Sequence, residues 1–251
     1  MASPVFTRSS VFQSPENRKR SFLLPVSDGS LMTVENALQK TVITFSVLLV
    51  AAGIGWFIPV LLLPGLVVGF VLGLVNAFKK EPSPTLILSY AVAEGLAIGG
   101  LSGIMEQQYS GIVSQAVLAT LCVVATVLFL YKSGKVRASA KMTKMFLIAM
   151  LGYALFSIVN VTLQLTGVVS DPWGLRNSLT VPGTEIPLGV ALGIFAVLLG
   201  AYSLILDFTY IDNGVENKLP EKYGWSAAFG ITVTIVWLYV EILRLMSYAR
   251  K

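Results

Sequence analysis

The sequence predicts an all-α integral membrane protein with seven transmembrane helices. Of its 251 residues, 55% are hydrophobic and 12% are charged, which is typical of polytopic membrane proteins and unlike soluble domains. Seven apolar stretches are each long enough to cross a bilayer at about 1.5 Å of rise per residue. Basic residues are concentrated in alternate connections between these stretches, as the positive-inside rule requires.

Residues 1–40 form a polar segment that is rich in Ser and Arg. It contains the basic run Arg18-Lys19-Arg20, and no apolar core of the signal-peptide type precedes the first span. We expect a disordered basic N-terminal arm that this run retains in the cytoplasm, with contact to lipid headgroups as the alternative. Residues 41–251 are then the transmembrane domain.

Apolar runs and the residues that interrupt them place the spans. Trp56 and Phe57 mark an interfacial end of the first span, Pro59 marks a turn, and Pro84 suits the first turn of the third span. A polar loop, residues 170–185, precedes the sixth span. The expected spans are about residues 41–58, 60–78, 85–105, 111–131, 145–165, 186–211 and 225–246.

The distribution of Lys and Arg predicts a cytoplasmic N-terminus and an external C-terminus. In this orientation fourteen of the eighteen basic residues lie on the inner side. They are Arg8, Arg18, Lys19, Arg20, Lys40, Lys79, Lys80, Lys132, Lys135, Arg137, Lys141, Lys144, Lys218 and Lys222. The outer side has Arg176 and the C-terminal Arg244, Arg250 and Lys251, a smaller group that disagrees with the rule but is outnumbered.

Composition also excludes several function classes. The net charge of +5 does not indicate nucleic-acid binding, because the basic residues lie between apolar spans. The chain has no histidine, which excludes His-ligated metal sites and Ser-His-Asp nucleophiles. Cys122 is the single cysteine, lies in an apolar span, and is interpreted as packing. We expect no enzyme activity, no cofactor and no resident metal.

Small residues recur four apart in three of the spans. This spacing lets helix backbones approach closely in lipid, and we interpret it as bundle packing rather than as a substrate site. The glycines do not follow a strand as a phosphate-binding loop does. They are Gly65, Gly69 and Gly73 in the second span, Gly95 and Gly99 in the third, and Gly189 and Gly193 in the sixth.

The seventh span has a polar stripe. Its members recur at steps of four, three, four and three, which places them on one helical face: Gly230, Thr234, Trp237, Glu241 and Arg244. Each charged group in a span costs on the order of 3 kcal/mol, so we expect this helix inside a bundle, facing protein or water. Glu241 and Arg244 either pair with each other, or Arg244 balances an acid on another helix.

Two further acids lie inside spans. Glu94 is near the middle of the third span and has no cation within one helical turn. It is either a pore or proton site, or a neutral carboxyl group that hydrogen-bonds across helices. Asp207 lies near the expected cytoplasmic end of the sixth span, where it is either a gate or ion ligand at the inner mouth, or a carboxylate that reaches the headgroups.

Three segments occur in a characteristic order: YAVAEGLAIGGLS in the third span, YSLILDF in the sixth and VWLYVEILRLM in the seventh. From about Thr41 to the C-terminus the chain resembles the Bax inhibitor-1 family of membrane proteins, especially its bacterial branch with a long polar N-terminus. The resemblance implies two layers of three helices around a central C-terminal helix. It also implies a pH-sensitive Ca²⁺ leak, suppression of stress-induced death or modulation of membrane proteases, and location in a bacterial plasma membrane.

The resemblance further implies a pH sensor in which an aspartate ending the sixth helix pairs with an acid in the seventh. Asp207 matches the first position. An ungapped match anchored on residues 242–245 places Thr234 at the second position, whereas a match anchored on residues 238–239 places Glu241 there. Glu241 is too deep, because it and Asp207 differ in depth by more than about 15 Å at about 1.5 Å per residue. We therefore expect the carboxylate pair to be absent or remodelled.

Two functional hypotheses compete. The first is a cation leak for Ca²⁺ or H⁺ through an acid-lined path that uses Glu94 and Asp207. Glu241, Arg244 and Thr234 are further candidates for the ion path or for pH sensing, and Ca²⁺ is a transported ion rather than a cofactor. The second is a non-conducting regulator that binds other membrane proteins, such as a protease, through the N-terminal arm and helix faces. Under either hypothesis we expect the protein to be embedded in the lipid bilayer.

Overall fold

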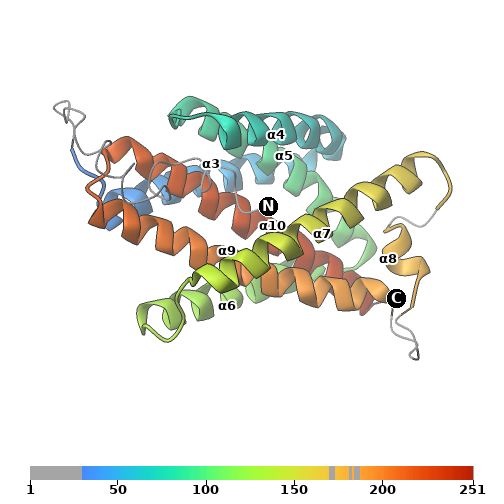
Figure 1. Cartoon of the computed structure of the whole chain (residues 1–251). Helices are drawn as coiled ribbons and strands as arrows, with labels where there is room; N and C mark the ends of the chain where they lie inside the picture. Colours follow the sequence, from blue (N-terminus) through green and yellow to red (C-terminus); the bar gives the residue numbers. More distant parts are fainter. Residues whose placement is uncertain (1–29, 170–172, 181–182, 184–186, 251) are drawn as a thin grey trace. The chain divides into compact units, whose positions relative to one another are not determined.

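The computed structural model of the chain describes residues 30–169, 173–180, 183 and 187–250. Within these residues, seven helices are long and apolar enough to cross a membrane, which confirms the predicted all-α fold (Figure 1). They are α3 (Val34–Phe57), α4 (Leu62–Phe78), α5 (Pro84–Gln108), α6 (Ile112–Lys132), α7 (Ala140–Leu165), α9 (Leu188–Glu216) and α10 (Gly224–Tyr248). The connections contain η2 (Pro59–Leu61), α8 (Leu175–Ser178) and η3 (Glu221–Tyr223).

The start of α3 differs from the prediction. The helix begins at Val34 rather than near residue 41, because Thr33 and Asn36 form a capping box. The Thr33 hydroxyl accepts a hydrogen bond from the Asn36 N–H, and the Asn36 side chain accepts one from the Thr33 N–H. Residues 30–40 therefore belong to the folded domain, which corrects the predicted boundary of the arm. The rest of the predicted arm, residues 1–29, lies outside the described residues.

Contacts with η3 and with the connection that precedes it hold the segment around the start of α3. The Met32 N–H donates to the Leu219 carbonyl at 2.7 Å, and Met32 is 2% exposed. The ammonium group of Lys40 lies 2.9 Å from a carboxylate oxygen of Glu221 and also donates to its backbone carbonyl at 2.8 Å. Lys40 is thus a buried, paired charge within α3 rather than the last charge of a loop.

The chain divides into two compact units. One unit contains α6, α7, α8, α9 up to Ile205 and α10 from Thr234 onward. The other contains α3, α4, α5, α9 from Leu206 onward and α10 up to Val233. The division falls inside α9 and α10, so each of these helices contributes one part to each unit.

In the unit that contains α5, this helix packs against both α3 and α4. The predicted glycines make the contact possible. A Cβ at Gly99 would collide with the backbone carbonyl of Ala52 in α3, and a Cβ at Gly65 of α4 would lie 2.7 Å from the Ala93 carbonyl oxygen. Backbones therefore meet without intervening side chains, which confirms the interpretation of these small residues as packing positions.

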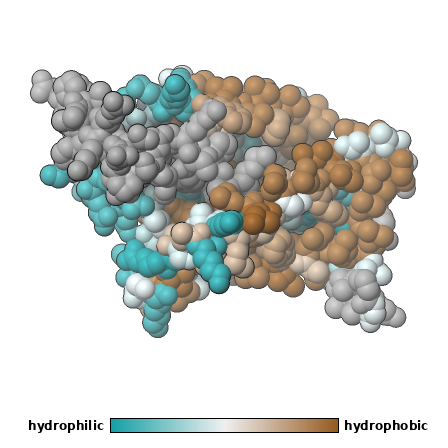
Figure 2. Space-filling model, in the orientation of Figure 1, coloured by the Kyte–Doolittle hydropathy of each residue, from teal (hydrophilic) through white to brown (hydrophobic). Residues whose placement is uncertain are grey.

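Burial distinguishes the two extremes among the seven spans. In the span that includes α10, 78% of the most apolar window is buried, whereas the value is 17% for the span that includes α4. The outer side of α4 carries large exposed residues such as Leu63 and Phe70, and Figure 2 shows hydrophobic residues over this helix. The helix α4 thus presents an apolar face to lipid, while α10 faces protein. The arrangement of two three-helix layers around α10 stays a prediction.

Candidate functional site

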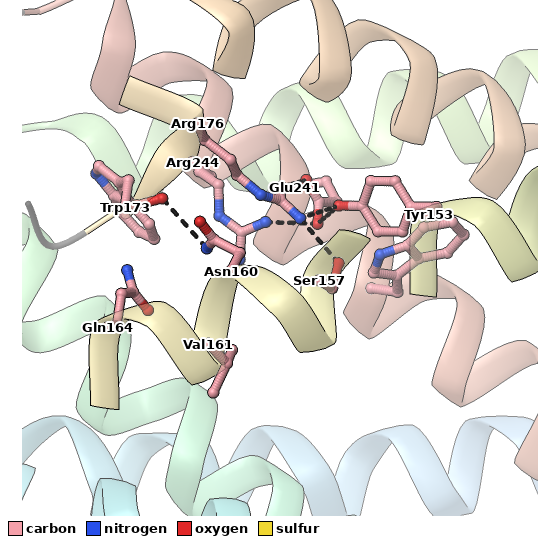
Figure 3. A pocket seen from close by; sticks show the side chains of 10 residues that line it. Tyr153, Ser157, Asn160, Val161, Gln164, Trp173, Arg176, Glu241 and Arg244 are labelled. Carbon is pink, nitrogen blue, oxygen red and sulfur yellow. Dashed lines mark hydrogen bonds and ion pairs between the residues drawn. The ribbon is translucent and has the colours of Figure 1, made fainter. Parts of the chain in front are cut away.

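A polar face on α7 lies opposite the polar stripe of α10 within one unit. Tyr153, Ser157, Asn160 and Gln164 recur at steps of four, three and four, so they project from one side of α7. Their side chains line a cavity of about 320 Å³ together with residues of α10 and of the segment that contains α8. The full lining is Tyr153, Ser157, Asn160, Val161, Gln164, Trp173, Arg176, Trp237, Glu241 and Arg244 (Figure 3).

The carboxylate of Glu241 is the centre of the charged network. It is 3% exposed. Its Oε1 accepts hydrogen bonds from Arg244 Nη1 at 2.7 Å and from the Tyr153 hydroxyl at 2.5 Å, and its Oε2 lies 3.4 Å from Arg176 Nη1. The structure therefore contains the local Glu241–Arg244 pair, and it adds a second guanidinium group from another element.

The sequence did not indicate Arg176 as a site residue, because it was assigned to an external loop, nor did it indicate Tyr153 and Ser157. Arg176 is 4% exposed on α8. Its Nη2 donates to the Tyr153 hydroxyl at 2.9 Å and to Ser157 Oγ at 3.1 Å, and its guanidinium carbon lies 5.0 Å from the centre of the Tyr153 ring. The available sequence signal was the need of Glu241, a buried acid, for positive charge and hydrogen bonds.

Asn160 fixes the segment that positions Arg176. Its Oδ1 accepts a hydrogen bond from the Leu175 N–H at 2.7 Å, at the first residue of α8. Gly174, which precedes α8, has a φ of +63° and packs directly on the Asn160 side chain, so a Cβ there would meet both steric and conformational strain. The backbone thus approaches α7 closely enough to direct Arg176 toward Glu241.

The network contains two guanidinium groups and one carboxylate, so the described lining of the cavity has a net charge of +1. The guanidinium carbon of Arg244 also lies 5.1 Å from the centre of the Trp173 ring. Such a lining disfavours a cation and favours an anion, because its positive charge exceeds its negative charge.

Thr234 of α10 contacts a hydroxyl group of α9. Thr234 is 4% exposed, and its hydroxyl lies 3.2 Å from Ser203 Oγ of α9. A neutral hydroxyl contact therefore occupies the position that the first sequence match assigned to the second acid. The proposed role of Thr234 in pH sensing stays a prediction.

Glu94 and Asp207 belong to the other unit. Asp207 is 2% exposed on α9. Glu94 is half-buried on α5, and its Oε2 lies over Gly69 of α4, where an added Cβ would be 2.6 Å away. Across the residues that the structure describes, no ion pair or hydrogen bond to the Glu94 carboxylate is found. Glu94 thus differs from Glu241, which has two cations and a hydroxyl.

The comparison with known families identifies the chain at the level of its family. A family model described as Bax inhibitor 1 like matches residues 3–251. The match covers essentially the whole chain, so this protein belongs to the Bax inhibitor 1 like family. No curated protein matches the chain.

Proposed function

We propose that this member of the Bax inhibitor 1 like family is a pH-sensitive leak for Ca²⁺ and other cations, with Glu94 and Asp207 along the path. The observation that carries the proposal is the Glu94 carboxyl group, which lies inside a span without a cationic partner among the described residues. An ionised acid in a span costs on the order of 3 kcal/mol. Water or a passing cation offsets that cost at the sites where such acids are functional.

Glu241, the third intramembrane acid, supports this assignment because its surroundings differ. Arg176 and Arg244 neutralise Glu241, and the net positive charge around it repels cations. The path is therefore assigned to Glu94 and Asp207, with Asp207 as the gate at the inner mouth. Glu241 and Arg244 serve the fold in this proposal.

Protonation provides the pH sensitivity. An ionised carboxylate attracts a cation and lowers the barrier to its passage, whereas a protonated carboxyl group does not. Acidification then reduces flux. Because Thr234 occupies the position matched to the second acid, the response should be shallow, close to one proton rather than two.

The test is Ca²⁺ uptake into liposomes that contain the purified full chain, measured from acidic to neutral pH. Glu94→Gln keeps the shape of the side chain and removes its charge, so uptake should fall while thermal stability is retained. Asp207→Asn should flatten the pH dependence. Glu81→Gln is a matched control, because Glu81 pairs with Lys222 through a side chain that is 69% exposed.

Unchanged uptake in Glu94→Gln would reduce Glu94 to a structural residue, and an unchanged pH profile in Asp207→Asn would remove the proposed gate. Absence of flux at every pH would favour the other hypothesis, a non-conducting regulator that binds membrane proteins such as a protease. Binding of such a partner would then be the property to measure.

We also propose that the protein lies in a bacterial plasma membrane with its N-terminus in the cytoplasm. Two of the four basic residues that opposed this orientation, Arg176 and Arg244, are paired with Glu241 and do not act as free loop charges. Reporter fusions at Lys251 and in the loop at residues 132–144 should give signals from opposite sides. Signals from the same side would contradict this topology.

A further inference from the structure

The cavity between α7, α8 and α10 has a charge imbalance that a cation leak does not use. Arg176 and Arg244 share one carboxylate, that of Glu241. Arg176 is 4% exposed, so its charge is not hydrated as a surface charge would be. A second anion in the cavity would balance the described charges.

Hydrogen-bond donors face the same space. The Nε of Arg244 is buried and has no partner among the described residues. The Asn160 amide nitrogen has a long contact, 3.4 Å, with the Trp173 carbonyl, which leaves it able to turn to a better acceptor. Guanidinium groups with an available Nε–H bind planar or tetrahedral oxyanions through two parallel hydrogen bonds.

One wall of the cavity reaches the lipid-facing side of α7. Val161 lines the cavity and is 50% exposed, and Ile158 and Leu165 on the same helix are also exposed. Trp173, which lies against Arg244, adds an aromatic surface of the kind found at the membrane interface. These surroundings suit a ligand with an anionic head and an apolar body.

We propose that this cavity is a binding site for a phosphate oxyanion, and that the phosphodiester headgroup of a membrane phospholipid supplies it. A phosphodiester has a single negative charge, which matches the net charge of +1 on the described lining. Its oxygens accept hydrogen bonds from Arg244 and Asn160, and its acyl chains lie along Val161. This site is independent of the proposed cation path.

The test is native mass spectrometry of the full chain in a neutral detergent, with phosphatidylglycerol and inorganic phosphate titrated separately. Arg244→Gln removes the charge imbalance but leaves the Arg176–Glu241 pair balanced, so it should fold and should bind about tenfold more weakly or worse. Arg244→Lys should fall between this variant and the wild type. Lys222→Gln is the control, because it removes an exposed positive charge elsewhere.

A second variant keeps the test decisive if Arg244→Gln does not fold. Asn160→Asp retains the acceptor for the Leu175 N–H and adds one negative charge to the cavity. It should abolish binding of both probes without loss of the fold. Thermal stabilisation by phosphatidylglycerol should appear in the wild type and disappear in this variant.

The outcomes separate the sources of the anion. Arg244-dependent binding of phosphatidylglycerol supports the lipid headgroup, and Arg244-dependent binding of inorganic phosphate alone supports the oxyanion site but assigns it to free phosphate. Binding of neither probe, or binding that Arg244→Gln and Asn160→Asp leave intact, overturns the proposal.

Discussion

Glu241 and Glu94 are both carboxyl groups inside membrane-spanning helices, but their surroundings have little in common. Glu241 has Arg244, Arg176 and the Tyr153 hydroxyl within hydrogen-bonding or ion-pairing distance. For Glu94, the described part of the chain contains no such partner, and the carboxylate lies over Gly69. Cations on the same and on a neighbouring element thus neutralise Glu241, whereas the described residues provide none for Glu94.

The physical basis is the cost of a charge away from water. A buried ion pair contributes little net stability, but removal of one partner leaves a charge that neither water nor protein neutralises. Glu241 is the shared partner of two guanidinium groups. Glu94 has no such cation beside it among the described residues, and this is why we propose it, rather than Glu241, as part of the cation path.

Removal of the charge at Glu241 should be the most damaging change. Glu241→Gln leaves the buried Arg176 and the half-buried Arg244 without a counter-charge, which should lower the free energy of unfolding by about 3–5 kcal/mol. The loss should appear as a large drop in Tm of the detergent-solubilised protein. A Tm equal to that of the wild type would show that the network does not stabilise the fold.

The double variant Glu241→Gln/Arg244→Gln is the control for this prediction. It removes one negative and one positive charge, so the described lining keeps the net charge of the wild type. It should therefore be less destabilised than the sum of the two single variants, because their effects are coupled through one contact. Additive losses would contradict the shared role of the carboxylate.

Substitution of two glycines of α4, Gly65 and Gly69, should show how firmly the Glu94 carboxylate is held. Gly65→Ala places a methyl group 2.7 Å from the Ala93 carbonyl oxygen, so the helices must separate, at a cost of about 1–3 kcal/mol. Gly69→Ala meets the flexible end of Glu94 instead, at 2.6 Å, and the carboxylate can rotate away. Thermal unfolding should show the larger loss for Gly65→Ala.

Ca²⁺ uptake should show the reverse order for these two glycines, because Gly69→Ala moves the carboxylate that is proposed to face the ion. Flux is best compared per folded protein, so that the stability loss of Gly65→Ala does not enter. Equal destabilisation by both substitutions would mean that Glu94 is held as rigidly as the backbone. That result would remove the contrast with Glu241.

Substitution of Lys40 should cause the smallest loss of stability, although Lys40 is also a buried cation in a span. Its partner Glu221 has a side chain that is 37% exposed, so water can solvate that carboxylate when the pair is lost. Lys40→Met keeps the apolar stem, and the loss should be about 1 kcal/mol or less. A fall in Tm as large as that of Glu241→Gln would show that the solvent exposure of Glu221 does not determine the loss of stability.

Much of the fold was readable from the sequence, because membrane helices are specified locally. Apolar length defined the spans, and glycines four apart marked the close contacts of α5 with α3 and α4. The helical period placed Glu241 and Arg244 on one face, and their local pair is present. These features depend on residues within a few turns of each other.

The features that were missed depend on residues far apart in the chain. Arg176 is 65 positions from Glu241, and a single arginine in a polar loop gives no local sign of burial. Lys40 was read as a loop charge because its partner, Glu221, is 181 positions away. A boundary drawn from hydropathy falls at the first charged residue. In the folded protein the helix can continue past that residue, because a distant group pairs with its charge.

The most direct test of the central claim is the initial rate of Ca²⁺ uptake at neutral pH into liposomes containing Glu94→Gln, normalised to folded protein. Glu81→Gln and the wild type are measured beside it. The account predicts a several-fold lower rate for Glu94→Gln alone, with its Tm close to that of the wild type. A rate equal to the wild type, together with a lowered Tm, would contradict the account, because Glu94 would then stabilise the fold as Glu241 does.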